Sequence, residues 1–214
     1  MHTQLHKSYA EILAHYLPPA FVNQAAFWVI NLDFDLKITR ARNTKLGDYR
    51  SPVNGGRHKI SINHNLNPYA FLVTLIHEIA HLITYNKFKW KVPPHGLEWK
   101  NEFKNLMFPV IQSGHLPVEL AKALHKYMMN PAAASCSDVN LFRALKYFDV
   151  KTNFDFIFVE QVQTNKHFDY QGRIFLRCEK KRTRIKCIEI KTKQVYLFNS
   201  VTEVKPISSI NTSV

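Results

Sequence analysis

The sequence predicts an α+β fold in which helices and a short antiparallel sheet are followed by a small C-terminal antiparallel β meander. Apolar residues recur at helical spacing in several segments before residue 150, whereas two segments between about residues 27 and 66 alternate apolar and polar residues. From residue 153 to about residue 204 the chain is rich in Phe, Ile, Val and Tyr, which favour strands. The 214 residues, 46% of them apolar, suffice for one core, or for one core and a small appendage.

The first predicted element is an amphipathic helix. Ser8 and Glu11 form a capping-box pattern, and apolar residues then repeat at helical spacing until Pro18. Two strands are predicted to follow, because apolar and polar residues alternate around Leu36 and again around Ile60. The turn signal at residues 54–56 lies between these two strands.

A buried helix is predicted to begin at Asn67 and Pro68, which suit the N-cap and the first helical position. The residues that follow, FLVTLIHEIAHLIT, are apolar nearly all round, which is typical of a helix inside a core. After a break at residues 93–94, the segment LEWKNEFKNLM has a helical period, and Pro109 is expected to end it.

Two more helices are predicted, one from Pro117 to about Met129 and one around residues 141–148, with residues 131–135 as a connector. Turn signals at residues 171–172 and 191–193 divide the C-terminal meander. We therefore predict a first domain over residues 1–130, a connecting helix over residues 131–150, and a basic β domain over residues 151–214.

Charge and cysteine content restrict the partners and the compartment. The formal net charge of +13 predicts attraction to polyanions such as nucleic acid. No stretch is long and apolar enough to span a bilayer, and the first residues do not resemble a secretory signal, so we expect no membrane partner. Three cysteines, Cys136, Cys178 and Cys187, form no C-x-x-C pair, which fits a reducing compartment. We expect a cytoplasmic protein, with association with the nucleoid as an alternative.

The buried helix carries the pattern H-E-x-x-H at residues 77–81. His77 and His81 project from the same helical face one turn apart, so both imidazoles can reach one metal ion. Zinc accepts neutral imidazole nitrogens, and Glu78 stands where a general base for a zinc-activated water is required. The alternative is a pair of core histidines that are hydrogen-bonded to Glu78.

A catalytic zinc site needs a third protein ligand. Four residues downstream could supply it, namely His95, Glu98, Glu102 and His115. We prefer His95, because it lies at the entrance of the next helix, where a short loop can bring it back over the first two histidines.

These residues resemble a known family. HEIAHL followed closely by PHGLEWK is similar to the SprT-like family of zinc metallopeptidases, in which a histidine of an H-G-x-x-W motif completes the site. The likeness covers roughly residues 5–110, and Gly96 and Trp99 complete the motif. It implies a zincin-like domain that holds one Zn²⁺ through His77, His81 and His95, with Glu78 as the catalytic residue.

The C-terminal region departs from this family. Many members carry a zinc ribbon with two C-x-x-C pairs, whereas the corresponding region here has only Cys178 and Cys187. The basic β domain therefore resembles a zinc ribbon that has lost its cysteines. Two interpretations remain for this pair: ordinary buried cysteines, or thiols that bind a metal together with His167.

Two surfaces are candidates for nucleic-acid binding. Residues 87–91 interleave basic and aromatic side chains, which can pair with phosphates and stack on an unpaired base; the alternative is that Phe88 and Trp90 pack inward. Residues 173–193 carry nine basic side chains against Glu179 and Glu189, on strands whose alternation would place many charges on one face. The predicted contacts are Lys87, Lys89, Trp90, Lys91, Arg177, Lys180, Lys181, Arg182, Arg184 and Lys186.

The leading hypothesis is a zinc endopeptidase of the SprT-like type that cleaves DNA-bound or DNA-crosslinked proteins, with Glu78 activating zinc-bound water. Its expected partners are protein substrates and DNA, including single-stranded DNA. The alternative is a non-catalytic nucleic-acid-binding or transcription-associated protein with a structural zinc site. A zinc hydrolase of small amides is a third hypothesis.

Overall fold

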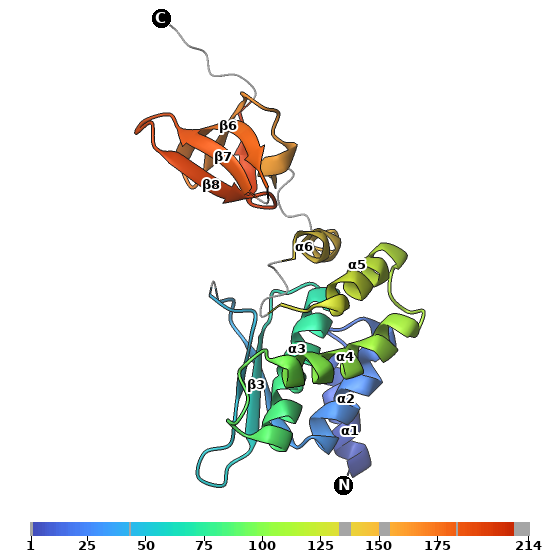
Figure 1. Cartoon of the computed structure of the whole chain (residues 1–214). Coiled ribbons are helices and arrows are strands. Elements are labelled where there is room, and N and C mark those ends of the chain that lie inside the picture. The colour runs from blue at the N-terminus through green and yellow to red at the C-terminus, as the bar shows by residue number, and fades with distance from the viewer. Residues whose placement is uncertain (1, 43, 133–137, 150–154, 183, 208–214) are drawn as a thin grey trace, which may run out of the picture. The chain divides into compact units, whose positions relative to one another are not determined.

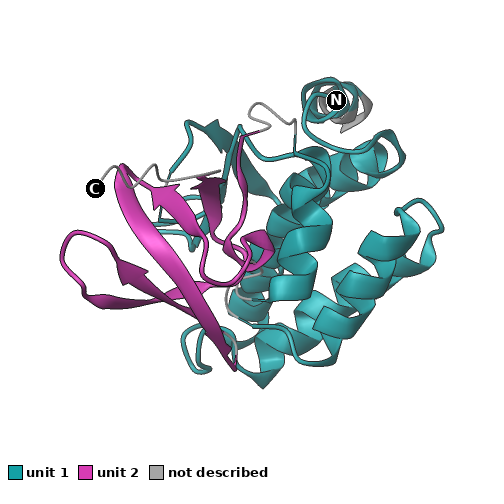
Figure 2. Ribbon diagram, turned by 90° about the horizontal axis from the view of Figure 1, so that it is seen from above, with its two compact units in different colours: residues 1–149 teal, residues 150–214 magenta. Residues whose placement is uncertain are grey.

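The computed structural model describes residues 2–42, 44–132, 138–149, 155–182 and 184–207, and the chain divides into two compact units. Unit 1 spans residues 1–149 and unit 2 spans residues 150–214 (Figure 2). Each unit has a hydrophobic core of its own. Most of the predicted connector, and Cys136 with it, lie outside the described residues.

Unit 1 combines α-helices with a three-stranded sheet, which confirms the α+β class (Figure 1). A 3-10 turn at Pro19–Phe21 precedes the second helix. The helices are α1 (His2–Leu13), α2 (Val22–Asn31), α3 (Pro68–Phe88), α4 (Leu97–Gln112), α5 (Val118–Met129) and α6 (Val139–Lys146). The strands are β1 (Phe34–Thr39), β2 (Gly47–Arg50) and β3 (His58–Asn63).

Helix α3 lies in the core of unit 1, as predicted. The Asn67 side chain caps it, because its Oδ1 accepts hydrogen bonds from the backbone N–H groups of Tyr69 at 3.1 Å and Ala70 at 2.9 Å. Pro68 occupies the first turn, where its missing N–H leaves no helical bond unmade. Buried side chains lie on nearly every side of α3, so any group that this helix carries is held in a fixed place.

Three helices differ from the prediction, two in their boundaries and one in having been missed. Helix α1 begins at His2 and ends at Leu13, so Ser8 lies within the helix and not at its N-cap. Helix α2 was not predicted; two of its four buried residues are alanines, which add little to a hydrophobic pattern. Helix α4 continues through Pro109 to Gln112, since a proline in the last turn removes one hydrogen bond and Val110 is buried beyond it.

The sheet of unit 1 is mixed, so the expectation of a short antiparallel sheet is wrong. The strand order is β1-β3-β2, with β1 parallel and β2 antiparallel to β3. The turn at residues 54–56 joins β2 to β3, not the two strands that were predicted. Strand β2 escaped prediction because the residues Gly47–Arg50 show no apolar alternation. It forms one edge of the sheet.

Unit 2 contains an antiparallel sheet with the strand order β4-β9-β5-β6-β7-β8, which confirms the predicted C-terminal antiparallel architecture. Gln171 and Gly172 join β5 to β6, and residues 191–193 lie between β7 and β8, as the turn signals indicated. The core includes Phe168, Phe175 and Phe198. The strands are β4 (Ile157–Phe158), β5 (His167–Tyr170), β6 (Arg173–Lys181), β7 (Arg184–Glu189), β8 (Val195–Asn199) and β9 (Glu203–Pro206).

Candidate metal centre

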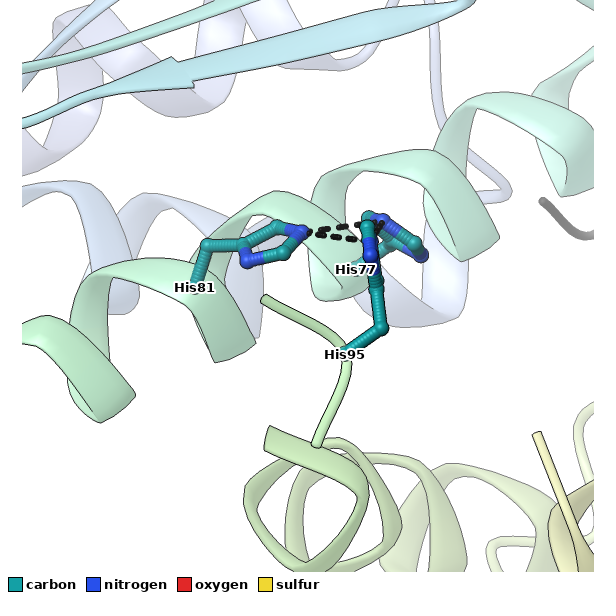
Figure 3. A group of neighbouring side chains, drawn as sticks. All are labelled: His77, His81 and His95. Carbon is teal, nitrogen blue, oxygen red and sulfur yellow. Dashed lines mark hydrogen bonds between the residues drawn. The ribbon is translucent and has the colours of Figure 1, made fainter. Parts of the chain in front are cut away.

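Three histidine side chains of unit 1 point toward one another (Figure 3). His77 and His81 come from α3, and His95 comes from the loop between α3 and α4. The Nε2 atom of His81 lies 2.9 Å from Nε2 of His95 and 3.2 Å from Nε2 of His77, and the remaining Nε2 pair is also 3.2 Å apart. Among the described residues this is the one group of His, Cys, Asp or Glu side chains with the spacing of metal ligands.

Hydrogen bonds among the three rings cannot satisfy all three nitrogens. Each Nε2 either carries a proton or presents a lone pair. With only these two states for three Nε2 atoms, at least two of the atoms must be in the same state. The contact between those two then joins two donors or two acceptors, which is not a hydrogen bond. A cation held by three lone pairs removes this conflict. Zn–N bonds of about 2.0–2.1 Å at tetrahedral angles place ligand nitrogens about 3.3 Å apart, close to the spacing found.

Burial keeps these imidazoles in the neutral form that binds metals. It lowers the pKa of His77 and the pKa of His81 to about 3, and the neighbouring histidines add to the effect. Burial also lowers the pKa of His95. The three rings are therefore uncharged at neutral pH, and each has a nitrogen lone pair to offer a cation.

Trp99 packs against all three histidines. It lies in the first turn of α4, is fully buried, and places its ring centroid 4.6 Å from His77, 5.3 Å from His81 and 4.7 Å from His95. Its indole N–H donates to the backbone oxygen of His77 at 3.4 Å. The tryptophan of the H-G-x-x-W pattern thus restricts the orientations of the ligands.

The loop that carries His95 is strained. His95 has a φ of 59°, in the left-handed region that costs a non-glycine residue about 1–3 kcal/mol. The N–H of Gly96 donates to the backbone oxygen of Pro93 at 3.0 Å and closes a tight turn. A Cβ at Gly96 would lie 3.0 Å from that same oxygen, so a larger residue would disturb the turn. With this strained backbone conformation, the His95 side chain points toward His77 and His81 of α3.

Glu78 is a buried carboxylic acid, with 7% of its surface exposed. Burial raises its pKa to about 8, and the negative charge of Asp48 acts in the same direction. The positive charges of Arg42 and Lys45 and a backbone hydrogen bond from Tyr49 oppose this shift. Within the described part of the chain, no basic side chain forms an ion pair with Glu78.

Residues 20–121 match the model of the SprT-like family. This part of the chain belongs to that family. The matched segment contains the three histidines, Glu78 and Trp99, whereas unit 2 lies outside it. Comparison with curated proteins and with solved structures gives no match. The SprT-like family is of a metallopeptidase type, and the histidine group of this chain is able to hold a metal ion.

The other candidates for a third ligand in the SprT-like domain do not join the two histidines of α3. The Glu102 carboxylate binds the Lys87 ammonium at 2.7 Å. The ring of His115 contacts Phe21, with centroids 6.3 Å apart. Glu98 lies beside Gly96 and is not in the metal-ligand group. The structure therefore brings His95, and none of these three, together with His77 and His81.

The two described cysteines, Cys178 and Cys187, form no metal-ligand group with His167 or any other described residue. Both are free thiols; Cys187 is buried and Cys178 half-buried. Burial raises the pKa of Cys187 to about 12, so it stays protonated. This supports the interpretation of ordinary core cysteines.

The predicted nucleic-acid contacts of the SprT-like domain lie at the end of α3. Trp90 is 73% exposed and packs edge-on against Tyr85, with ring centroids 5.0 Å apart, so the alternative of inward packing is wrong for this residue. The Lys89 ammonium lies 4.8 Å from the centre of the same Tyr85 ring. Lys91 is exposed, whereas Lys87 is bound to Glu102.

The predicted contacts of unit 2 gather at one end of the hairpin formed by β6 and β7. Lys181 and Arg184 are direct cross-strand neighbours, and Lys180 pairs with Ile185. Lys180 and Lys181 therefore point to opposite faces, whereas Lys181, Arg184 and Lys186 lie on one face. Arg182 is exposed, Lys186 lies 3.6 Å from Glu179, and Arg177 binds Thr164 through its guanidinium group.

Sequence reasoning missed two residues beside the centre, Gly47 and Tyr49, both on β2. A Cβ placed on Gly47 would lie 2.5 Å from Oε1 of Glu78. The Tyr49 ring lies nearly parallel to that of His81, with centroids 6.3 Å apart and an interplanar angle of 8°. Neither residue belongs to a recognised sequence pattern, so only knowledge of the sheet pairing could have identified them as neighbours of the centre.

None of the described helices is both long and apolar enough to cross a membrane.

Proposed function

We propose that this protein is a zinc-dependent endopeptidase of the SprT-like type in a zincin-like fold, with one Zn²⁺ held by His77, His81 and His95. The observation that carries the proposal is the triangle of Nε2 atoms, 2.9–3.2 Å on a side, together with the adjoining residue Glu78, which is buried and forms no ion pair with another described residue. Three protein ligands leave one coordination position open, which is typical of catalytic zinc, whereas structural zinc has four protein ligands.

Glu78 is the proposed general base. When bound, zinc supplies a Lewis acid and lowers the pKa of a coordinated water to about 7. The positive charge of the ion also favours the ionised form of Glu78, whose pKa is raised to about 8 in its absence. The carboxylate then takes the proton of the water that attacks the peptide carbonyl and passes it to the leaving amine.

The proposed substrates are proteins bound or crosslinked to DNA. The support is electrostatic: the net charge of +13 and the exposed basic groups at the end of α3 and on the hairpin of unit 2. Trp90 adds an exposed ring at the end of α3, which can stack on an unpaired base. DNA held there would restrict proteolysis to proteins on the same strand.

The test uses the zinc-loaded protein and a protein crosslinked to DNA, with and without added single-stranded DNA. Cleavage should appear with the crosslinked substrate, and Glu78→Gln should reduce its rate by at least about 100-fold while zinc binding and folding persist. An equally active Glu78→Gln variant contradicts the proposal.

Two other outcomes identify the rival functions. Salt-dependent DNA binding without any cleavage that depends on Glu78 indicates a non-catalytic nucleic-acid-binding protein. Cleavage of small amides that ignores DNA altogether indicates a hydrolase of another class.

A further inference from the structure

We infer that the edge strand β2 positions the metal centre, with Gly47 placing the Glu78 carboxylate and Tyr49 fixing the ring of His81. The inference rests on the proposed function and adds positioning residues to it. The four residues of β2 show no hydrophobic pattern. This strand nevertheless lies against both the proposed base, through Gly47, and one proposed ligand, through Tyr49.

Gly47 leaves space for Glu78. A Cβ at this position would lie 2.5 Å from Oε1 and 2.9 Å from Cγ of Glu78, and 2.7 Å from Cγ2 of Thr74. Its φ is not in the left-handed region, so any residue could adopt its backbone. The close approach, not the conformation, therefore requires glycine here.

Tyr49 contacts the centre in two ways. Its backbone N–H donates to the Glu78 carboxylate, and its ring lies parallel to His81. The phenol oxygen lies 2.9 Å from Nδ1 of His58, and the two rings are stacked with centroids 5.8 Å apart. The phenol oxygen lies on the rotation axis of the ring, so packing of the ring, not this hydrogen bond, sets the plane of the tyrosine and restricts the plane of His81.

The loop before β2 is held by a buried polar network. Asn63, only 1% exposed, donates from its side chain to the backbone oxygens of Arg42 at 3.2 Å and Lys45 at 3.0 Å. Its Oδ1 accepts from Nε of Arg42 at 2.7 Å, and its backbone N–H donates to Leu46 at 2.9 Å. The chain that enters β2 is thus fixed to β3 immediately before Gly47.

The first experiment uses the zinc-loaded full chain with Gly47→Ala. We expect kcat on the crosslinked substrate to fall about 100-fold, because displacing a catalytic group by about 1 Å lowers the rate by about this factor. KM and the zinc Kd should stay unchanged. The double variant Gly47→Ala/Thr74→Ser removes the Thr74 methyl group and leaves the Glu78 contact, so it should not recover. An unchanged kcat for Gly47→Ala, or recovery in the double variant, overturns the role of Gly47.

The second experiment measures zinc affinity by chelator competition and needs no cleavage, so it decides the role of Tyr49 even if the proposed function fails. Tyr49→Leu removes the ring and should weaken zinc binding by about 10-fold, whereas Tyr49→Phe keeps the ring and should bind nearly as the unaltered protein does. Arg50→Ala is the control: Arg50 lies on the opposite face of β2 and binds Asp48, so this variant should leave the zinc affinity unchanged. Equal affinities for Tyr49→Leu and Arg50→Ala would refute the role of Tyr49.

Discussion

Among the residues that the structure describes, each unit buries one glutamate, and the two are held in opposite ways. Glu78 of unit 1 is 7% exposed and has no ion-pair partner among the described residues, and its pKa is raised to about 8. Glu189 of unit 2 is 5% exposed, accepts two hydrogen bonds of 2.8 Å from Arg173, and has a pKa lowered to about 2. Burial alone therefore does not set the charge of a carboxyl group; its partner does.

The difference is the one expected between the proposed catalytic glutamate and a structural glutamate. Arg173 is itself held over the rings of Phe175 and Tyr196, 5.2 Å and 4.8 Å from their centroids, and Thr192 completes the bonds to Glu189. Both carboxylate oxygens of Glu189 thus accept hydrogen bonds. Glu78 keeps an unfavourable buried position that a cation beside it would relieve, which is the condition expected of an active-site acid.

Zinc should therefore stabilise unit 1 and leave unit 2 unchanged. At about 1,000 times its dissociation constant, a ligand that binds only the folded state adds about 4 kcal/mol to the free energy of unfolding. Trp28, Trp90 and Trp99 all lie in unit 1, so tryptophan fluorescence during urea unfolding reports this unit alone. A His95→Ala variant is the control and should lose most of the effect. Equal stabilisation of the variant would contradict the three-histidine site.

Glu189→Gln should destabilise unit 2 without affecting zinc binding. The amide cannot accept two charge-assisted hydrogen bonds, and Arg173 is left without its counter-charge. Native-state hydrogen exchange at the amides of Phe175 and Phe198 measures the change within unit 2. Arg173→Met/Glu189→Met should be milder than Glu189→Gln, since it removes both charges. If the single variant is as stable as the unaltered protein, the pair contributes nothing.

The two glutamates should also give the metal-free protein opposite pH dependences. Glu189 has a folded pKa below its ordinary value of 4.5, so its contribution is present above about pH 4.5 and is lost as the pH falls toward 2. Glu78 has a folded pKa above 4.5, so its own contribution to the stability of unit 1 falls as the pH rises from about 4.5 to 8, whereas the three histidines, whose folded pKa values are lowered, act in the opposite direction below about pH 6.5. Urea unfolding across this range, with Glu78→Gln and Glu189→Gln as controls, separates the two slopes. A slope that survives its own variant belongs to another group.

The sequence predicted what depends on local pattern. The N-cap at Asn67, helix α3 and its paired histidines follow from spacing within one segment, and the structure contains α3 with that cap. Strand β2, the parallel pairing of β1 with β3, and the proximity of Gly47 to Glu78 depend on contacts between segments far apart in the chain. Such contacts leave no periodic signal, and for this reason strand β2 was missed although the three histidines that lie together were named.

The smallest expected change in the free energy of unfolding comes from an exposed ion pair that, like the pair in unit 2, joins a glutamate to a basic side chain. Glu119 and Lys122 on α5 are 2.8 Å apart, but their side chains remain 82% and 68% exposed. Water and salt already solvate both charges, so Glu119→Gln should change the free energy of unfolding by less than about 1 kcal/mol in tryptophan-detected urea unfolding. A loss as large as that of Glu189→Gln would show that contact distance, not burial, determines the strength of these pairs. The distinction between the two buried glutamates would then need another cause.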